Sequence, residues 1–372
     1  MGSIFGKLNH LRELKAKLRQ KLEERDVTVT DENTFQEYVD KVDDINTLKK
    51  FLEFRGVQNL FEDVNSLTEI PEDLICDYDL RDITNMAHMF YNCSKLTTIP
   101  QLDTSNVTNM GGMFERCPKL STIPQLDTSN VVYMGSMFQN CSKLTTIPQL
   151  DTSNVTNMGS MFYNCSKLTT IPQLDTSKVT NMAAMFYNCS SLTTIPQLDT
   201  SNVVYMGRMF YSCTSLTTIP QLDTSNVVDM GSMFQNCSKL TTISQLDIGN
   251  VTNASEMFKN CSKLTNCRLK NIKVSLRVGS GTTYGHLLTV DSLLFMIGEL
   301  VKANNFHSFY VGSANLTKLS NIYVRTIDIT DAMRAEDALI DQKLPFEVCT
   351  SSDSGAKLVS DYVRLKNWYL NE

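Results

Sequence analysis

Apolar residues return along most of this chain in a pattern that repeats every 24 residues. Eight cysteines keep that register without an insertion: Cys93, Cys117, Cys141, Cys165, Cys189, Cys213, Cys237 and Cys261. The same unit recurs around each of them, as in the stretch LDTSNVTNMGGMFERCPKLSTIP that starts at Leu102. A fixed period of this length is the signature of stacked structural repeats. The pattern therefore predicts a solenoid, in which each rung buries its apolar face against its neighbours.

One rung combines a helix-like spacing with a strand-like one. Four apolar residues fall at steps of three and four: Met110, Met113, Phe114 and Cys117. Such steps are typical of the core face of a short helix, for which Thr108 is a suitable N-cap. Residues 120–123 have the length and composition of a short strand, which Pro124 would end. The repeat thus predicts an α/β solenoid, with one parallel ladder of short strands and a helical layer behind it.

Two polar features recur from rung to rung. Aspartates stand at one position: Asp79, Asp103, Asp127, Asp151, Asp175, Asp199, Asp223 and Asp247. We expect their carboxylates to accept backbone N–H bonds in Asx-type turns, because Thr and Ser follow them in most rungs. Calcium binding is the alternative, but calcium-binding solenoids use glycine-rich loops that supply further ligands. Threonine pairs such as Thr145 and Thr146 lie in the predicted strand, so only one of each pair should be exposed, which disfavours a flat surface that orders water.

The amino-terminal segment predicts a separate helical module. An apolar stripe at helical spacing marks its first helix: Leu8, Leu11, Leu14, Leu18 and Leu22. The stripe predicts an amphipathic helix that docks on a partner. A capping box at Thr34 and Glu37 starts a second helix.

The carboxy-terminal segment predicts a cap. Residues 288–301 predict a helix capped by Thr289 or Asp291, residues 308–311 a strand, and residues 356–368 a further helix. Such a unit would close the open edge of the solenoid, which otherwise invites pairing with another chain. The predicted domains are a helical docking module at 1–50, the solenoid at 51–272 and an α/β capping region at 273–372.

Composition and charge narrow the function classes. The chain has 372 residues, 42% of them hydrophobic and 20% charged, and a formal net charge of −6. Its apolar runs are too short to cross a bilayer and its amino terminus lacks the apolar core of a secretory signal, so we expect neither membrane insertion nor a signal peptide. Residues 1–25 are basic, which suggests an acidic partner, although a solvated helix explains this as well. The acidic, nearly neutral array disfavours nucleic-acid binding.

Candidate catalytic chemistry is sparse. The histidines lie outside any nucleophile, metal-ligand or phosphate-loop motif: His10, His88, His286 and His307. The eight periodic cysteines are best explained as buried, inert thiols. A catalytic site needs unique residues in one place, which a uniform repeat does not offer. We therefore expect no enzyme activity, no metal and no cofactor.

Variation at surface positions of so uniform a repeat points to a binding surface. Tyrosines occupy two slots, one after the core Phe and one before a core Met: Tyr91, Tyr133, Tyr163, Tyr187, Tyr205 and Tyr211. Exposed tyrosines in a row suit stacking on sugars or apolar protein patches, since each offers rigid area at low entropic cost. Half-buried packing between rungs is the alternative and stays open.

The string LDTSNVTNMGSMFYNCSKLTTIPQ, from Leu150 to Gln173, resembles the repeat of BspA-like leucine-rich-repeat proteins. The resemblance covers residues 60–267. It implies a leucine-rich-repeat array of 24-residue rungs that serves surface attachment or protein interaction, without known catalytic residues.

Both flanks resemble phage proteins. Residues 18–45 are similar to the helix-loop-helix openings of phage tail and baseplate proteins, and residues 288–320 to the terminal unit that follows such repeats in phage structural proteins. The resemblance implies a non-enzymatic virion component of the tail, baseplate or fibre, held by other virion proteins at its amino-terminal helices. Its solenoid would meet a host surface glycan or protein during adsorption. A bacterial BspA-like adhesin is the alternative, a carbohydrate-active enzyme a more distant one, and the oligomeric state stays open.

Overall fold

A computed structural model describes residues 83–274 without a break, and around them the short pieces 58–59, 61–63, 65, 67–69, 80, 276–278, 288–289, 292, 295–296, 308–311 and 347–349. The predicted docking module at 1–50, with its leucine stripe, and the helix predicted at 356–368 lie outside the described residues. The chain forms two compact units, Met1–Leu168 and Thr169–Glu372, and the repeat is present in both.

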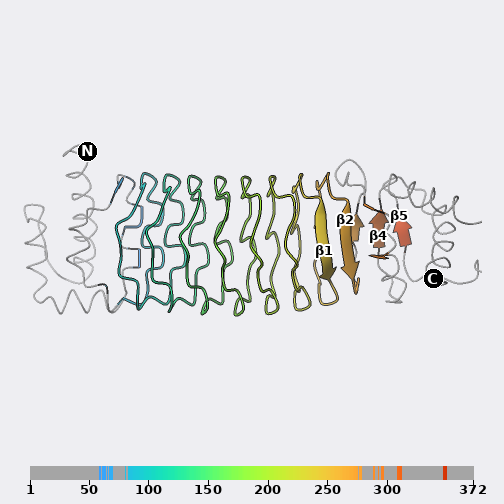
Figure 1. The fold of residues 1–372 in the computed structure, drawn as a ribbon, viewed down its shortest axis with the longest axis horizontal. Helices are drawn as coiled ribbons and strands as arrows, with labels where there is room; N and C mark the ends of the chain where they lie inside the picture. Colours follow the sequence, from blue (N-terminus) through green and yellow to red (C-terminus); the bar gives the residue numbers. More distant parts are fainter. Residues whose placement is uncertain are drawn as a thin grey trace, which may run out of the picture. The chain divides into compact units, whose positions relative to one another are not determined.

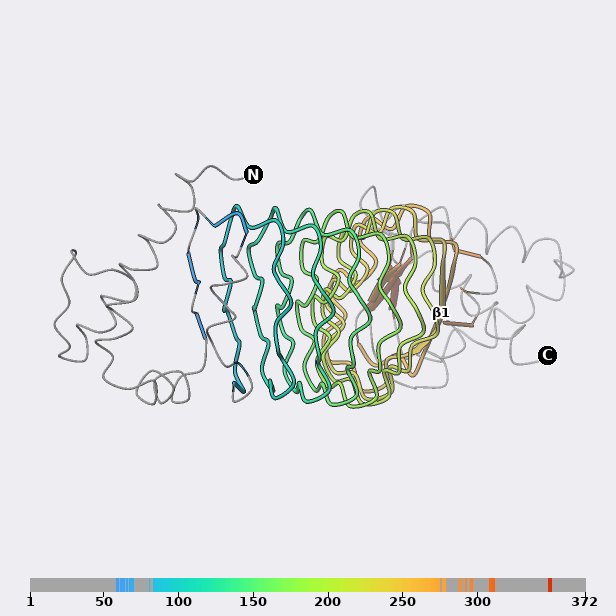
Figure 2. The same cartoon turned by 60° about the vertical axis from the view of Figure 1, so that its left-hand side comes forward.

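Backbone hydrogen bonds join successive rungs within each unit. In the first unit, the N–H of Met110 donates to the carbonyl of Tyr133 at 2.9 Å. In the second, the N–H of Phe186 donates to the carbonyl of Met209 at 2.9 Å. Figures 1 and 2 show the rungs of each unit side by side. The predicted repeat solenoid is confirmed, and it is leucine-rich-repeat-like in that leucines of every regular rung face the core.

The segment predicted as a short helix is a run of tight turns. The N–H of Met113 donates to the carbonyl of Met110 at 3.2 Å, and Gly112 between them has a φ of 60°, as the third residue of a type II turn requires. The N–H of Gly112 donates to the carbonyl of Gly135 in the next rung at 2.9 Å. A helix would use these N–H groups internally and leave none for the neighbouring rung. The helix prediction is therefore wrong, although the four apolar side chains that suggested it are fully buried.

Regular strands appear only toward the end of the described repeat. Strand β1, Thr242–Asp247, pairs in parallel with β2, Asn266–Lys270, drawn in yellow and orange in Figure 1. In the described rungs before β1, the segment at 120–123 and its equivalents form no strand, contrary to the prediction. Proline explains the difference, because it has no N–H to donate to a ladder. In β1 Ser244 takes the place of the repeated proline, and β2 contains no proline.

Beyond the repeat, three strands form a parallel sheet in the order β3-β4-β5: Leu276–Val278, Ser308–Val311 and Glu347–Cys349. Strand β4 confirms the strand predicted at 308–311. Ser292 is helical and its N–H donates to Thr289 Oγ1 at 3.3 Å, in agreement with the predicted helix and with Thr289 as its cap. Among the described residues, none of the helical segments has the length and apolar character needed to span a bilayer.

Stacked phenylalanines form the centre of each core. In the first unit the ring centroids of Phe114 and Phe138 are 5.7 Å apart with 8° between their planes, and the second unit repeats this geometry. Cysteine supports the stack: Cys141 Sγ donates to the carbonyl of Phe114 at 3.1 Å. The nine described cysteines are buried thiols that form no disulfide, and burial raises the pKa of the Cys261 thiol to about 12. These thiols are inert core groups, as predicted for the periodic cysteines.

Candidate binding surface

The recurring aspartates are occupied within their own turns. Asp103 Oδ1 accepts the N–H of Ser105 at 3.1 Å and its hydroxyl at 2.7 Å. The N–H and the hydroxyl of Ser177 bind Asp175 in the same way and lower the pKa of that carboxyl. The predicted Asx-type turn is confirmed. Within the described part of the chain, no group of three or more His, Cys, Asp or Glu could hold a metal ion.

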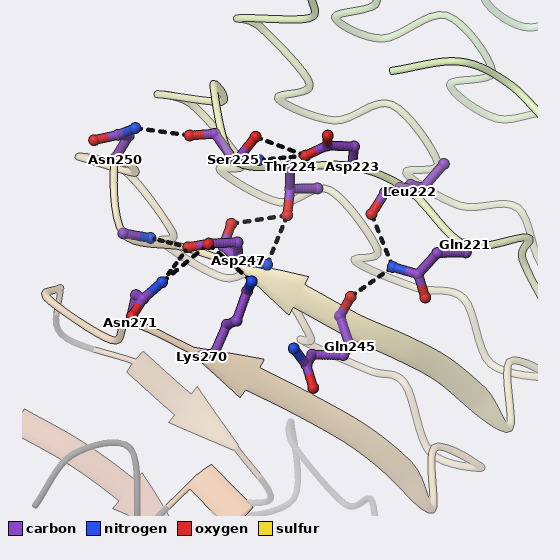
Figure 3. Close-up of polar contacts among 11 residues, drawn as sticks. Gln221, Leu222, Asp223, Thr224, Ser225, Gln245, Asp247, Asn250, Lys270 and Asn271 are labelled. Atoms are coloured by element: carbon purple, nitrogen blue, oxygen red, sulfur yellow. Dashed lines mark hydrogen bonds and ion pairs between the residues drawn. The ribbon is translucent and has the colours of Figure 1, made fainter. Parts of the chain in front are cut away.

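Other recurring polar side chains bond from one rung to the next, as Figure 3 shows for the second unit. Thr224 Oγ1 donates to the carbonyl of Asp247 at 2.8 Å. Gln221 Nε2 donates to the carbonyl of Gln245 at 2.8 Å. The glutamine follows the repeated proline, so its side-chain amide bonds across the rungs where the proline offers no N–H. These residues maintain the stack and are not free to bind a ligand.

The threonine pairs differ from the prediction, because both members are exposed. Thr145 and Thr146 both face solvent, and so do the pairs at 97–98 and 193–194. The flanking Leu144 and Ile147 both point into the core, at 0% and 8% exposure. The prediction of one exposed threonine assumed a pleated strand, in which neighbouring side chains alternate. Since this segment is not a regular strand, the two residues between the inward anchors share the outer face.

Two tyrosines stand out on the turn side of the rungs. Tyr133 is 44% exposed and Tyr205 50% exposed, and with Val132 they are the exposed large apolar residues of the described part. A Cβ at Gly111 would lie 2.5 Å from Tyr133 Cε1, and a Cβ at Gly135 would lie 2.7 Å from its Oη. The Tyr133 ring therefore lies where a side chain at either glycine would clash with it.

The other four candidate tyrosines follow the core phenylalanine and are half-buried: Tyr91, Tyr163, Tyr187 and Tyr211. In the second unit the rings of Tyr187 and Tyr211 are parallel, with centroids 4.4 Å apart. Tyr187 and Tyr211 thus pack ring on ring between successive rungs. The structure divides the six tyrosines between an exposed slot and a half-buried slot.

A cluster of residues that differ from those at the same positions in other rungs surrounds Tyr91 in the first unit. The ring of His88 meets Tyr91 edge-on at 5.5 Å, and Arg116 Cζ lies 5.6 Å from the centre of the same ring. Glu115 Oε2 is 3.9 Å from His88 Nδ1, and its Oε1 accepts Gln139 Nε2 at 3.2 Å. Burial raises the pKa of Glu115, although His88 and Arg116 act to lower it. The cluster combines an aromatic ring, a cation and a carboxylate, groups that suit a polar ligand.

Reasoning from the sequence did not connect His88 with Glu115 and Arg116, because they lie in neighbouring rungs and match no local motif. The sequence does mark the positions of Glu115 and Arg116 as departures from the repeat. Where Glu115 stands, other rungs carry mainly Tyr or Gln, and where Arg116 stands, mainly Asn. Aligning the rungs and marking departures at adjacent slots would have pointed to this cluster.

Comparison with protein families places the repeat. The family model "Mycoplasma protein of unknown function, DUF285" matches at residues 55–170, 141–239 and 166–272. Together these matches span more than half of the chain. The chain belongs to the DUF285 family. Membership supports the BspA-like, leucine-rich-repeat type expected from the sequence, and the DUF285 description itself states no function.

Two solved repeat proteins show distant similarity to this DUF285 chain. The T. pallidum leucine-rich-repeat protein TpLRR is 17% identical over 53% of this chain and 76% of that chain, with a TM-score of 0.29. TLR13 in its complex with ssRNA13 is 12% identical over 66% of this chain and 52% of that chain, with a TM-score of 0.17. TM-scores this low carry no argument about fold or function. No curated protein matches the chain.

Proposed function

We propose that this DUF285 chain is a non-enzymatic binding protein whose rungs present exposed tyrosines to a host surface glycan or protein. The exposure of Tyr133 and Tyr205 on a backbone that is hydrogen-bonded from rung to rung carries this proposal. A tyrosine held open on a rigid support loses little entropy on binding, and offers both a face for stacking and a hydroxyl for hydrogen bonding.

The use of polar side chains supports a non-enzymatic role. The recurring Asp side chains are engaged in bonds within their own turns, and the recurring Thr and Gln side chains bond from one rung to the next. The cluster at His88 is the place where residues that depart from the repeat come together, and it comprises His, Tyr, Glu, Arg and Gln. Covalent catalysis requires a nucleophile beside a positioned base, and among the described residues no hydrogen bond joins the His88 ring to a hydroxyl or thiol.

The setting that we propose is a phage virion, with the chain as a tail, baseplate or fibre component. The proposal rests on the resemblance of residues 18–45 and 288–320 to phage structural proteins. In that setting the amino-terminal segment would bind other virion proteins, and the tyrosines would meet the host envelope. A BspA-like adhesin would present the same tyrosines from a bacterial surface.

The repeat itself supplies a mild substitution for the test. Tyr133 and Tyr205 occupy a slot that holds asparagine in rungs such as that of Asn109. Asn109 Oδ1 accepts the N–H of Gly111 at 2.9 Å, so asparagine fits this slot and bonds to the turn beside it. The double variant Tyr133→Asn with Tyr205→Asn should therefore fold normally while it loses both exposed rings.

The test measures binding of the purified full chain to host cell envelopes and to purified phage particles. We expect the double variant to bind envelopes roughly tenfold or more weakly, since exposed aromatic anchors dominate such contacts, and to bind particles unchanged. Thr146→Ala, at an exposed position outside the tyrosine slots, is the control and should bind both like the wild type. Unchanged envelope binding by the double variant, or particle binding without any envelope binding by the wild type, would refute the proposal.

A further inference from the structure

A row of lysines recurs on the first unit. Four successive rungs carry an exposed lysine at the same position: Lys95, Lys119, Lys143 and Lys167. Each lysine lies in a tight turn between a buried cysteine and a buried leucine. In the turn that holds Lys143, the N–H of Leu144 donates a hydrogen bond to the carbonyl of Cys141 at 3.0 Å. These anchors fix where each lysine leaves the backbone, and rungs about 4.8 Å apart place the four in one row.

The lysine row has no partner among the residues that the structure describes. Other recurring polar side chains of a rung bond to the array, as Gln101, Asp103 and Thr104 do. None of the four lysines forms an ion pair or hydrogen bond in the part of the chain that the structure describes. The recurring aspartates lie in turns of their own, where their carboxylates accept hydrogen bonds from the serines of those turns.

Four stacked ammonium groups destabilise the array that carries them. Like charges directly opposite on neighbouring strands repel each other, and here the repulsion recurs at every step of the row. A rung does not require lysine at this position, because Ser191 and Ser215 fill it in the second unit, whereas Lys239 and Lys263 fill it in later rungs of that unit. An external anion that spans several rungs would relieve the repulsion.

We propose that the lysine row binds a linear acidic polysaccharide. The exposed neighbours of the row are hydroxyl residues such as Thr97, Thr98 and Thr122, which can bond to sugar hydroxyls and carboxylates. Single-stranded nucleic acid would require an aromatic ring for successive bases, and these neighbouring positions supply hydroxyls instead. The site is separate from the open tyrosine slot and goes beyond the function proposed above.

The probes are polygalacturonate, neutral dextran and a short duplex DNA, each titrated against the full-length protein at low and at physiological salt. The test variant carries Lys95→Gln, Lys119→Gln, Lys143→Gln and Lys167→Gln. The control variant removes the same charge from lysines outside the row: Lys178→Gln, Lys259→Gln, Lys270→Gln and Lys273→Gln. Two of these control lysines are ion-paired, Lys259 with Glu256 and Lys270 with Asp247.

We expect the wild type to bind polygalacturonate but not dextran, and to bind it more weakly as salt rises, because salt screens exposed charges. The row variant should lose about tenfold or more in affinity, while the control variant keeps it. The thermal midpoint of the row variant should not fall, because the substitutions relieve repulsion between the lysines. The same measurement shows that the row variant is folded. Tyr133→Asn with Tyr205→Asn should leave polygalacturonate binding unchanged, which separates this site from the tyrosines.

Three results would overturn the proposal. An unchanged affinity in a folded row variant would show that the row is only a solvated edge. Equal losses in the row and control variants would reduce the effect to net charge. Tighter binding of duplex DNA than of polygalacturonate, lost in the row variant, would assign the row to nucleic acid.

Discussion

Each regular rung repeats the same side-chain bonds, so the stacking itself dictates most of its recurring residues. Cys117 Sγ donates to the carbonyl of Phe90 at 3.0 Å, and Cys213 Sγ to that of Phe186 at 3.1 Å. A buried carbonyl oxygen has two lone pairs, and leaving one without a donor costs free energy. Cysteine at this position supplies a donor that is also small and apolar enough for the core.

Truncating a stacked phenylalanine should cost much of the stability. Phe138 is fully buried, and its ring lies 5.7 Å from those of Phe114 and Phe162. We expect Phe138→Ala to lower the free energy of unfolding by about 3 to 5 kcal/mol, because it opens a cavity between two rungs. Urea unfolding followed by circular dichroism measures this. A loss below about 1 kcal/mol would show that the rungs collapse around the gap and that the stack is not rigid.

Acid should weaken the aspartate turns. The hydroxyl and the N–H of Ser201 lower the pKa of Asp199, and those of Ser177 that of Asp175. A lowered folded-state pKa adds stability above the unfolded value of about 3.9, and this is lost as the pH falls through the folded value. The thermal midpoint should therefore drop below about pH 4, and less steeply in the variant Asp175→Asn with Asp199→Asn. If the thermal midpoints of wild type and variant fell equally with pH, the loss of stability would not come from these aspartates.

At the scale of elements, the apolar spacing predicted burial correctly and secondary structure incorrectly. Steps of three and four direct side chains to one face of a helix, but alternating turns direct Met110, Met113 and Phe114 inward just as well. Local evidence against a helix was present in the sequence. The residue before most of the periodic cysteines is asparagine, which tolerates a positive φ, and Asn140 has a φ of 63°.

Proline was the overlooked signal for the strands. It recurs at the end of the predicted strands before β1, and it has no N–H to donate to a parallel ladder at that point. Only an isolated bridge joins Thr218 to Thr242, next to Pro220, whereas β1 with Ser244 pairs as a full strand. Strand formation in this array thus coincides with the absence of the repeated proline.

Replacing one proline should extend the sheet. We expect Pro220→Ser to convert the bridge at Thr218 into a ladder against β1 and to protect the new amide at 220 from hydrogen exchange. Pro220→Ala is the matched control and should give the same protection, because the N–H and not the hydroxyl forms the bond. Fast exchange at 220 in both variants would show that another feature of the rung prevents pairing.

At the scale of the whole molecule, the 24-residue period revealed the candidate tyrosines but not which of them are exposed. Tyrosines were visible as departures from a uniform repeat. Which of them are open depends on the residues of the adjacent rungs, since Tyr187 stacks on Tyr211 whereas Tyr133 lies over Gly111. The cluster at His88 escaped detection for the same reason, because its members meet only through stacking.

Removing a whole rung should leave a folded protein. Deleting residues 121–144 joins Leu120 to Thr145 and restores the Leu-Thr junction found in other rungs. Each rung bonds mainly to its neighbours, so the shortened array should unfold cooperatively with a smaller urea m-value. Deleting half a rung is the control and should abolish folding, because it places core positions at the surface. Loss of folding in the whole-rung variant would contradict the stacked-rung architecture.

The central claim is that the open tyrosines contact the host, and competition for phage adsorption tests it most directly. Purified chain is added to host cells before the phage, and the adsorption rate is measured against protein concentration. We predict that the wild type slows adsorption in a saturable way and that Tyr133→Asn with Tyr205→Asn does not, because only the wild type occupies the host sites. Equal protection by both proteins, or none by either, would contradict the account.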